Sequence, residues 1–244
     1  MCYILRRFKS LKYSILKIRH LFFDLDHTLW DFEKNSQVCL QQIFDKNDVI
    51  FTGKISFQEF NDTFSVINKG LWDALDQGQI THEYLRKIRF QKVLSACDIH
   101  IDEETSFSLN DMFLNLLPHQ KLLMDDALAT LQALEKKAYK MHIISNGYHE
   151  IQKLKMESSG ILHFFECIVT NDIAGSRKPE KEIYEYALNK ANAHVSESVM
   201  IGDNLVADIE GAQKAGWKTV HFDINGAYTP NTKINALSQL LEIF

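Results

Sequence analysis

The sequence predicts an α/β protein with a Rossmann-like, three-layer core built on a mainly parallel sheet, and with a helical subdomain inserted into that core. Three observations predict this fold. An apolar run over residues 21–23 leads into Asp24 and Asp26, as expected for a buried strand that ends at a polar site. Residues 33–118 show helical periodicity and almost no strand-like alternation. From residue 125 onward, strand-like and helix-like segments alternate, which implies right-handed crossovers between parallel strands.

The length and composition are those of an ordinary globular protein. The chain has 244 residues, of which 45% are hydrophobic and 24% are charged. This length suits one large α/β domain, or one domain that carries an insertion. The four cysteines are widely scattered and form no CxxC pair, so we expect neither a disulfide framework nor a zinc site. A reducing, cytoplasmic location fits this cysteine usage.

The first twenty residues differ from the rest of the chain. They contain six basic residues and no acid, so residues 21–244 hold 21 of the 27 basic residues and all 32 acidic ones, a balance of −11. That acidic balance argues against a nucleic-acid-binding body. Apolar residues recur at helical spacing in this segment, at Ile4, Phe8, Leu11, Ile15 and Ile18. We expect an appended helix or arm, with an anionic membrane surface or a targeting role as alternatives, and no stable membrane insertion.

Local signals divide the helical block into separate helices. Ser56 and Glu59 have the spacing of a capping box and start an apolar helical stripe. The break at residues 77–79 ends this pattern, and Thr81 can cap a second helix. A third helix is expected over residues 107–117. The aromatic residues of the stripe are expected to be packing core rather than a base-stacking surface.

The second half of the chain predicts the remaining core. The expected strands cover residues 141–144, 167–169, 199–201 and 219–221. The expected helices run from Asp125 to 134, through 154 to about 159, from just after Pro179, from 208 to 215, and from Ile234 to 241.

Polar residues follow four of the predicted strands. They are Asp24 with Asp26, Ser145 with Asn146, Asn171 with Asp172, and Asp203. Because the carboxyl ends of parallel strands lie along one edge of a sheet, these groups are expected to form one site. Taken singly, each has an ordinary structural interpretation as a turn or a helix cap. Their occurrence together at consecutive strand ends favours a functional site.

The carboxylates predict the chemistry of that site. Asp24 and Asp26 are two residues apart, so in extended backbone both point to the same side. Such a pair either binds a hard cation such as Mg²⁺ or divides the roles of nucleophile and general acid/base. If a phosphate monoester binds there, Asp203 and Asp208 add to a cluster of negative charge that Lys178 and Mg²⁺ would offset. Protonation of Asp26 would remove one negative charge and supply the leaving oxygen with a proton.

Four motifs resemble those of the haloacid dehalogenase superfamily of phosphatases. They are Asp24-Leu25-Asp26-His27-Thr28, Ser145-Asn146, Arg177-Lys178-Pro179 and Gly202-Asp203-Asn204-Leu205-Val206-Ala207-Asp208. The resemblance covers about residues 21–225, and the inserted helical block is similar to the family's cap of the first type. It implies a core over residues 21–32 and 119–244 and a cap over 33–118, and it leaves residues 1–20 as a basic extension with no counterpart in the family. Residues 23–32 are similar to the subgroup of pyrimidine 5'-nucleotidases, or house-cleaning nucleotidases.

The resemblance also implies a role for each motif residue. Asp24 would be the nucleophile, and Asp26 would be the general acid/base whose backbone carbonyl also binds the metal. Thr28, Ser145, Asn146 and Lys178 would bind the phosphoryl group. Mg²⁺ would be held by Asp24, Asp26, Asp203 and Asp208, the last acting through water or by orienting Lys178.

These features predict a Mg²⁺-dependent phosphomonoester hydrolase that forms an aspartyl-phosphate. Its small-molecule substrate is expected to be a nucleoside 5'-monophosphate, most of all a pyrimidine one. A sugar phosphomutase or sugar-phosphate phosphatase of the same fold is the first alternative, and a non-catalytic binding module is the second. A dehalogenase is disfavoured because that branch lacks an acid at the position of Asp26. The sequence predicts no particular oligomeric state.

Overall fold

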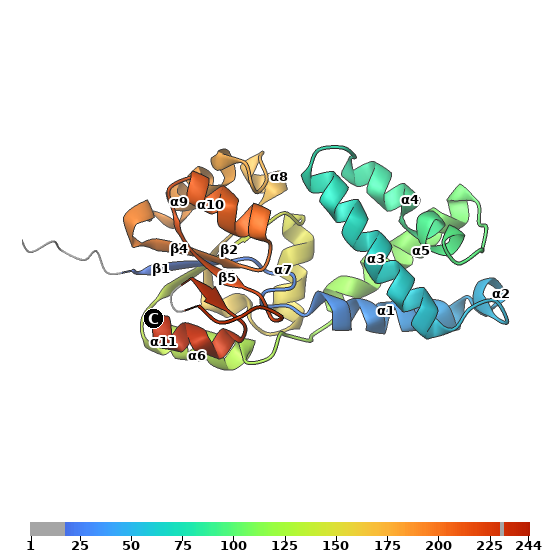
Figure 1. Ribbon diagram of the computed structural model, residues 1–244, viewed down its shortest axis with the longest axis horizontal. Coiled ribbons are helices and arrows are strands. Elements are labelled where there is room, and N and C mark those ends of the chain that lie inside the picture. The colour runs from blue at the N-terminus through green and yellow to red at the C-terminus, as the bar shows by residue number, and fades with distance from the viewer. Residues whose placement is uncertain (1–17, 230–231) are drawn as a thin grey trace, which may run out of the picture.

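The structure is a computed structural model that describes residues 18–229 and 232–244. The apolar stripe expected near the N-terminus lies outside the described residues, apart from Ile18. Figure 1 shows a sheet with helices on both sides and, beside it, a second group of helices. The predicted α/β class is therefore confirmed.

A six-stranded sheet forms the centre of the core, and every strand pairing in it is parallel. The strand order is β3-β2-β1-β4-β5-β6. The strands are β1 (His20–Phe23), β2 (Lys140–Ser145), β3 (Phe165–Thr170), β4 (Ser198–Gly202), β5 (Lys218–Phe222) and β6 (Lys233–Ile234). The chain moves outward from β1 in one direction through β2 and in the other through β4. Ligands bind at such a switch point in open α/β sheets, so β1 leads directly to the expected site.

Alternating residues of β1 anchor the two faces of the sheet. Phe22 packs on one face with residues of α9 (Lys181–Ala191) and α10 (Gly211–Lys214). Leu21 and Phe23 pack on the other face with residues of α6 (Ala127–Lys136), α7 (His149–Ser158) and α11 (Leu240–Ile243). Because successive side chains of a strand point to opposite faces, one apolar run supplies both layers of the core.

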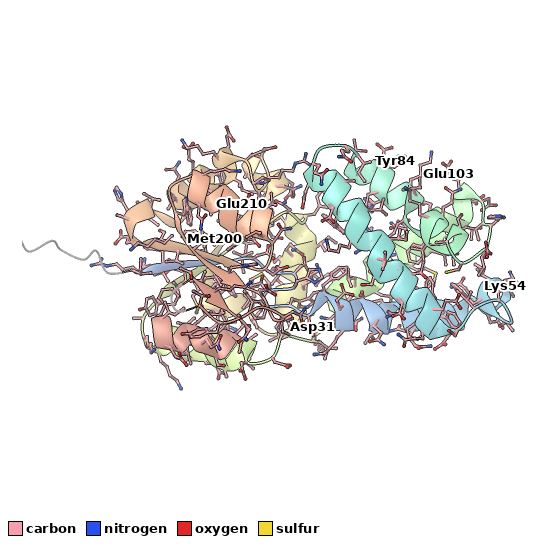
Figure 2. The ribbon with its side chains drawn as sticks, in the orientation of Figure 1. Asp31, Lys54, Tyr84, Glu103, Met200 and Glu210 are labelled. Atoms are coloured by element: carbon pink, nitrogen blue, oxygen red, sulfur yellow. The ribbon has the colours of Figure 1, made fainter. Side chains whose placement is uncertain are left out.

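The inserted block consists of α1 (Phe32–Lys46), α2 (Asp48–Phe51), α3 (Phe57–Asp76), α4 (His82–Ser95) and α5 (Glu103–Leu116), which we call the cap helices. Asp31, which caps α1, lies where the core meets the cap helices (Figure 2). The two predicted caps are confirmed: the Ser56 hydroxyl accepts from the Glu59 amide at 3.2 Å, and the Thr81 hydroxyl accepts from the Tyr84 amide at 3.1 Å. Phenylalanines pack the interior, which confirms the aromatic stripe as core; they are Phe60, Phe64, Phe90 and Phe113.

Several predicted helix boundaries are wrong. Helix α5 begins at Glu103 rather than near residue 107, because the Asp102 carboxylate accepts from the Thr105 amide at 2.8 Å. Asp125 does not cap α6; Asp126 precedes that helix in a left-handed conformation with φ 63°, and its side chain makes no capping bond.

The C-terminal part also differs from the prediction. Ile234 was expected to begin a helix, but it lies in β6 and pairs with Phe222 of β5. The helix expected from residue 208 is a π-helix, η4 (Leu205–Glu210), followed by α10. The remaining short elements are α8 (Asn171–Ala174), η1 (Leu117–His119), η2 (Leu162–Phe164), η3 (Val195–Glu197) and η5 (Leu237–Gln239). None of the described helices combines the length and apolar content needed to cross a bilayer.

Candidate active site

The carboxyl ends of three neighbouring strands meet at one cavity of about 760 Å³. Asp24 follows β1, Ser145 ends β2 and Asp203 follows β4, and all three line this cavity. The cap helices form its other wall. Residues distant in sequence therefore converge as predicted, in a cavity of the size that binds small molecules.

The end of β3 does not join them. Asn171 and Asp172 were expected at the site, but neither lines the cavity. The Asp172 carboxylate accepts from the His149 amide at 3.2 Å, and the Asn171 amide contacts the His82 ring at 3.2 Å. Their roles are a helix cap and a contact between core and cap helices.

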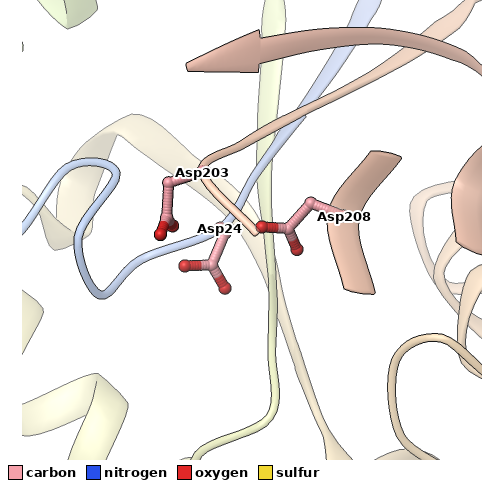
Figure 3. A group of neighbouring side chains, drawn as sticks. All are labelled: Asp24, Asp203 and Asp208. Atoms are coloured by element: carbon pink, nitrogen blue, oxygen red, sulfur yellow. The ribbon is translucent and has the colours of Figure 1, made fainter. Parts of the chain in front are cut away.

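Three carboxylates form an acidic cluster at the cavity floor. Oxygen atoms of Asp24, Asp203 and Asp208 all lie within 4.8 Å of one another (Figure 3). Burial, together with the nearby Asp208 charge and against the opposing charge of Lys178, raises the pKa of Asp24 to about 7. Burial, followed by the charge of Asp24, raises the pKa of Asp203 to about 6. The cluster therefore binds positive charge favourably.

Lys178 is the protein's own cation in this cluster. Its side chain is 3% exposed, and its Nζ lies 2.5 Å from Asp24 Oδ1, 2.6 Å from Asp208 Oδ1 and 2.8 Å from the Ile144 carbonyl oxygen. Burial alone would lower the pKa of Lys178, but the charges of Asp208 and Asp24 outweigh burial and raise it. Lys178 is therefore held charged against the carboxylate predicted to be the nucleophile.

Asp208 is engaged on both of its oxygens. Oδ1 accepts from Lys178, and Oδ2 accepts from the Asn204 amide at 3.0 Å. A Cβ atom at position 202 would collide with this carboxylate, so Gly202 is required for its close approach. Of the two roles expected for Asp208, orienting Lys178 is the one that its contacts support.

The donor set fits Mg²⁺. Carboxylate oxygens are the hard ligands that this ion prefers. Both oxygens of Asp208 accept hydrogen bonds, whereas Asp24 and Asp203 each accept on Oδ1 alone within the described structure. Asp24 and Asp203 are therefore the carboxylates that would hold the ion, and the ion would neutralise the negative charge that raises their pKa values.

Asp26 lies in a different electrostatic environment from Asp24. Its Oδ1 lies 2.7 Å from Lys155 Nζ, and its Oδ2 accepts from Gln152 Nε2 at 2.8 Å. Burial favours a raised pKa for Asp26, but Lys155 and then Gln152 outweigh it, so the pKa is lowered. Protonation of Asp26 was predicted for the site with a phosphate monoester bound, whereas its contacts in the structure favour the carboxylate form beside a buried cation.

Lys155 and Gln152 were missed by the sequence analysis because they lie on a helix rather than at a strand end. Both are buried on α7, and Lys155 Nζ also lies 4.6 Å from the centre of the Trp30 ring. Gln152 Nε2 additionally donates to the Ser145 hydroxyl at 2.6 Å. Polar residues at core-facing positions of an amphipathic helix are the signal that would have identified them.

The predicted phosphate-binding residues are only partly exposed to the cavity. Ser145 and Asn146 line it, whereas Thr28 does not. Thr28 is fully buried, donates to Asp203 Oδ1 at 2.9 Å and accepts from the Asp203 amide at 3.1 Å. Its contacts therefore position Asp203, which differs from the expected contact with phosphate.

Asn146 connects the cap helices to the core. Its Nδ2 donates to Asp76 Oδ1 of α3 at 3.1 Å and to the Lys178 carbonyl at 3.0 Å, and its Oδ1 accepts from the Lys178 amide at 2.8 Å. Arg177 Nη1 adds a hydrogen bond of 2.6 Å to the Leu75 carbonyl. The segment that carries Lys178 is thus fixed between the sheet and the cap helices.

Comparison with known proteins identifies the family. The family model for haloacid dehalogenase-like hydrolases matches residues 18–216. The chain belongs to this family. It is 30% identical over 229 residues to the pyrimidine 5'-nucleotidase YjjG of Escherichia coli, an alignment that covers 91% of this chain and 96% of YjjG. It is 27% identical over 244 residues to a glyceraldehyde 3-phosphate phosphatase of Pyrococcus furiosus, with 93% of each chain covered.

The fold comparison agrees with this assignment. A crystal structure of the haloacid dehalogenase-like hydrolase YfnB from Bacillus subtilis, described as bound to magnesium, matches with a TM-score of 0.81 and 27% identity. The match covers 93% of this chain and 98% of YfnB. As a haloacid dehalogenase-like hydrolase with phosphatase relatives, the chain is an enzyme of the phosphoric monoester hydrolase class.

Proposed function

We propose that the protein is a Mg²⁺-dependent 5'-nucleotidase that hydrolyses pyrimidine nucleoside monophosphates through an aspartyl-phosphate. The observation that carries the mechanism is the position of Asp24, a buried carboxylate at the end of the central strand that lines the cavity and contacts Lys178. A pyrimidine substrate is supported by the likeness to YjjG over nearly the whole chain. The cytoplasmic location expected from cysteine usage is part of this proposal.

In the first step, an oxygen of Asp24 attacks phosphorus and forms a P–O bond while the bond from phosphorus to the ester oxygen breaks. Asp26 gives a proton to the departing alcohol. Lys178 and Ser145 line the cavity with Asp24, where they can stabilise negative charge on the phosphoryl oxygens, and Mg²⁺, when bound, would add two positive charges to the same region.

In the second step, Asp26 takes a proton from water as the water oxygen attacks phosphorus. The bond from phosphorus to Asp24 breaks, which releases inorganic phosphate, restores the Asp24 carboxylate and returns Asp26 to the protonated form that the first step uses. The Lys155 contact favours the carboxylate form of Asp26 that this step requires, while the first step requires Asp26 to gain a proton before it acts.

The test is release of inorganic phosphate from UMP, dUMP, dTMP, AMP and β-glucose 1-phosphate, with Mg²⁺ or with EDTA, for the wild type and Asp24→Asn. We expect Mg²⁺-dependent release that prefers pyrimidine nucleotides, and a loss of at least about 10³-fold in the variant, because the nucleophile is removed. Release from the sugar phosphate alone would support the sugar-phosphatase alternative instead. Full activity of Asp24→Asn would refute the proposed nucleophile.

A further inference from the structure

One face of helix α4 forms part of the cap wall of the cavity. His82, Leu85, Arg86 and Arg89 all line the cavity, and their spacing of three and four residues places them on the same side of the helix. Two of the four are arginines. This face therefore brings positive charge to the wall opposite the phosphate-binding residues.

Arg89 is a buried cation without a hydrogen-bond or ion-pair partner in the described structure. It is 3% exposed, and among the described residues no side chain or carbonyl accepts a hydrogen bond from it. Its Nε is enclosed and unpaired, while the guanidinium carbon lies 5.4 Å from the centre of the Phe113 ring. Burial, followed by the charge of Arg86, lowers the pKa of Arg89 to about 9. An unpaired buried cation is costly, so such a group at a cavity wall indicates a ligand.

The other cavity cations differ from Arg89 in this respect. Lys178 contacts Asp24 and Asp208, Lys155 contacts Asp26, and Lys69 of α3 pairs with a carboxylate on its own helix. Arg86 has no carboxylate partner among the described residues either, but it is exposed to solvent. Among the cations that line the described part of the cavity wall, Arg89 alone is both buried and unpaired.

Arg89 lies further along α4 than the end of the helix that contacts the core. His82, at the start of the helix, contacts the core through the Tyr148 ring and Asn171. Arg89 follows seven residues later, about 10 Å further along the helix axis at 1.5 Å per residue. Arg89 is therefore separated by about this distance from the end of α4 that contacts the core.

Asn68 of α3 adds a second group to this subsite. It is 5% exposed, lines the cavity, and its Oδ1 has no hydrogen-bond partner in the described structure. A carboxamide offers an acceptor or a donor according to its rotation, whereas a guanidinium offers donors only. Arg89 can therefore donate to a carbonyl oxygen on the edge of a ring, while Asn68 Oδ1 can accept from a neighbouring donor on that edge. A second phosphate, which offers only acceptors, leaves Asn68 Oδ1 unpaired.

We propose that Arg89, together with Asn68, is the base-recognition site of this enzyme, and that Arg89 donates a hydrogen bond to the carbonyl oxygen at C2 of the pyrimidine. This carbonyl is present in uracil, thymine and cytosine alike. The proposal rests on the proposed nucleotidase function, because it names the part of the nucleotide that the cap wall binds.

The experiment compares UMP with ribose 5-phosphate, which keeps the phosphate and the sugar but lacks the base. The wild type, Arg89→Met and Arg89→Lys are assayed with Mg²⁺. Lys87→Met is the matched control, because Lys87 lies on the exposed face of the same helix and pairs with Glu103. We expect Arg89→Met to lower kcat/KM for UMP by roughly 10- to 100-fold, as for loss of a hydrogen bond to a charged group. The value for ribose 5-phosphate should change by less than about 3-fold.

Arg89→Lys keeps the charge but loses the planar fork, so an intermediate loss for UMP is expected. Thermal unfolding of each variant identifies any loss of fold, and Arg89→Lys carries the test if Arg89→Met does not fold. Equal losses for both substrates, or no loss for UMP, would overturn the proposal. A loss confined to a sugar bisphosphate, tested in parallel, would also overturn it, because the ligand of Arg89 would then be a second anion.

Uridine binding separates this proposal from the proposed nucleotidase function. Calorimetric titration of uridine into the Mg²⁺-loaded enzyme measures base recognition without hydrolysis. If the wild type fails to hydrolyse UMP but binds uridine in an Arg89-dependent manner, the nucleotidase function is wrong and the base site stands. If UMP is hydrolysed but uridine binding is unchanged in Arg89→Met, the base site is wrong and the nucleotidase function stands.

Discussion

The two walls of the cavity differ in whether their buried cations have partners within the described structure. On the core wall, the buried cations Lys178 and Lys155 each contact a carboxylate. On the cap wall, Arg89 is buried without a hydrogen bond or ion pair within the described structure. The core groups are therefore preorganised for reaction before substrate arrives, as electrostatic catalysis requires. Arg89 on the cap wall gains a hydrogen-bond partner only when substrate binds, as expected of a residue that selects substrates.

Removing the central cation of the core wall should have the largest effect. Lys178→Met leaves Asp24 and Asp208 as buried negative charges without their partner, so we expect activity to fall at least about 100-fold. We also expect the free energy of unfolding to fall by roughly 3–5 kcal/mol, the usual cost of breaking a buried ion pair from one side. Phosphate release and chemical denaturation measure the two effects.

Lys181→Met is the matched control for this change. Lys181 lies three residues further along and pairs with Glu185, but both side chains are more than half exposed. Its replacement should leave activity and stability unchanged within error. Equal effects of the two substitutions would contradict the assignment of Lys178 to a buried catalytic network.

This contrast between the walls also explains what the sequence could predict. Asp24, Ser145 and Asp203 follow buried strands, and a parallel sheet brings strand ends together whatever the details of packing. The partners of these residues depend on side-chain packing instead. Lys155 and Arg89 lie on helices at core-facing positions, and the helical spacing that marks such a position does not show which group the side chain contacts. Thr28 was placed at the site by its motif, but only the structure shows its hydroxyl bonded to Asp203.

The helix and strand boundaries that were predicted wrongly have a similar cause. Ile234 reads as the start of a helix, yet it completes the edge of the sheet beside Phe222, a contact between segments that local periodicity does not report. Asp125 is a good capping residue by type, but the chain turns at Asp126 in a left-handed conformation and the helix starts one residue later. The predicted cap boundaries at residues 33 and 118 stay predictions.

The acidic cluster gives a second way to test the core wall, through stability rather than activity. The pKa values of Asp24 and Asp203 are raised to about 7 and about 6, so the folded state binds protons more tightly than the unfolded state does. Their contribution to stability is therefore greatest at low pH and is lost as the pH rises from about 4 to about 7. Burial lowers the pKa of His142 to about 3, so His142 adds stability over the same pH range and the cluster must be tested by comparison with a variant. In EDTA, the cluster should make the melting temperature of the wild type fall relative to that of Asp203→Asn as the pH rises, and excess Mg²⁺ should oppose this relative fall.

Asp203→Asn should weaken this pH dependence. Removing one charge from the cluster is expected to stabilise the EDTA-treated protein at pH 8 by on the order of 2 kcal/mol, and to reduce its stabilisation by Mg²⁺. Asp125→Asn is the control, because the Asp125 side chain is 91% exposed and lies outside the cavity wall. The same pH dependence of the melting temperature in wild type and Asp203→Asn, both in EDTA, would show that the cluster does not carry excess negative charge.

The contact between Lys155 and Asp26 should appear in the pH dependence of turnover. Lys155 favours the carboxylate of Asp26, so Lys155→Met should raise the pKa of that group. The limb of the kcat profile that depends on Asp26 should then move to higher pH by about one unit, whichever of its two forms limits turnover. Lys153→Met is the control, since Lys153 lies on the same helix and pairs with Glu157 at the surface. A loss of kcat with no shift along the pH axis would assign Lys155 to packing against Trp30 instead.

The smallest effect is expected at Arg86, and it tests the difference between an exposed and a buried arginine of the cap wall. Arg86 lines the same cavity as Arg89 and lies one turn before it, but it is exposed. Water already solvates an exposed guanidinium and screens its charge, so substrate gains little by pairing with it. We therefore expect Arg86→Met to lower kcat/KM for UMP by only about 2- to 3-fold, well below the loss in Arg89→Met. Losses of equal size at the two positions would mean that net positive charge, rather than a buried unpaired donor, is what the cap wall supplies to the substrate.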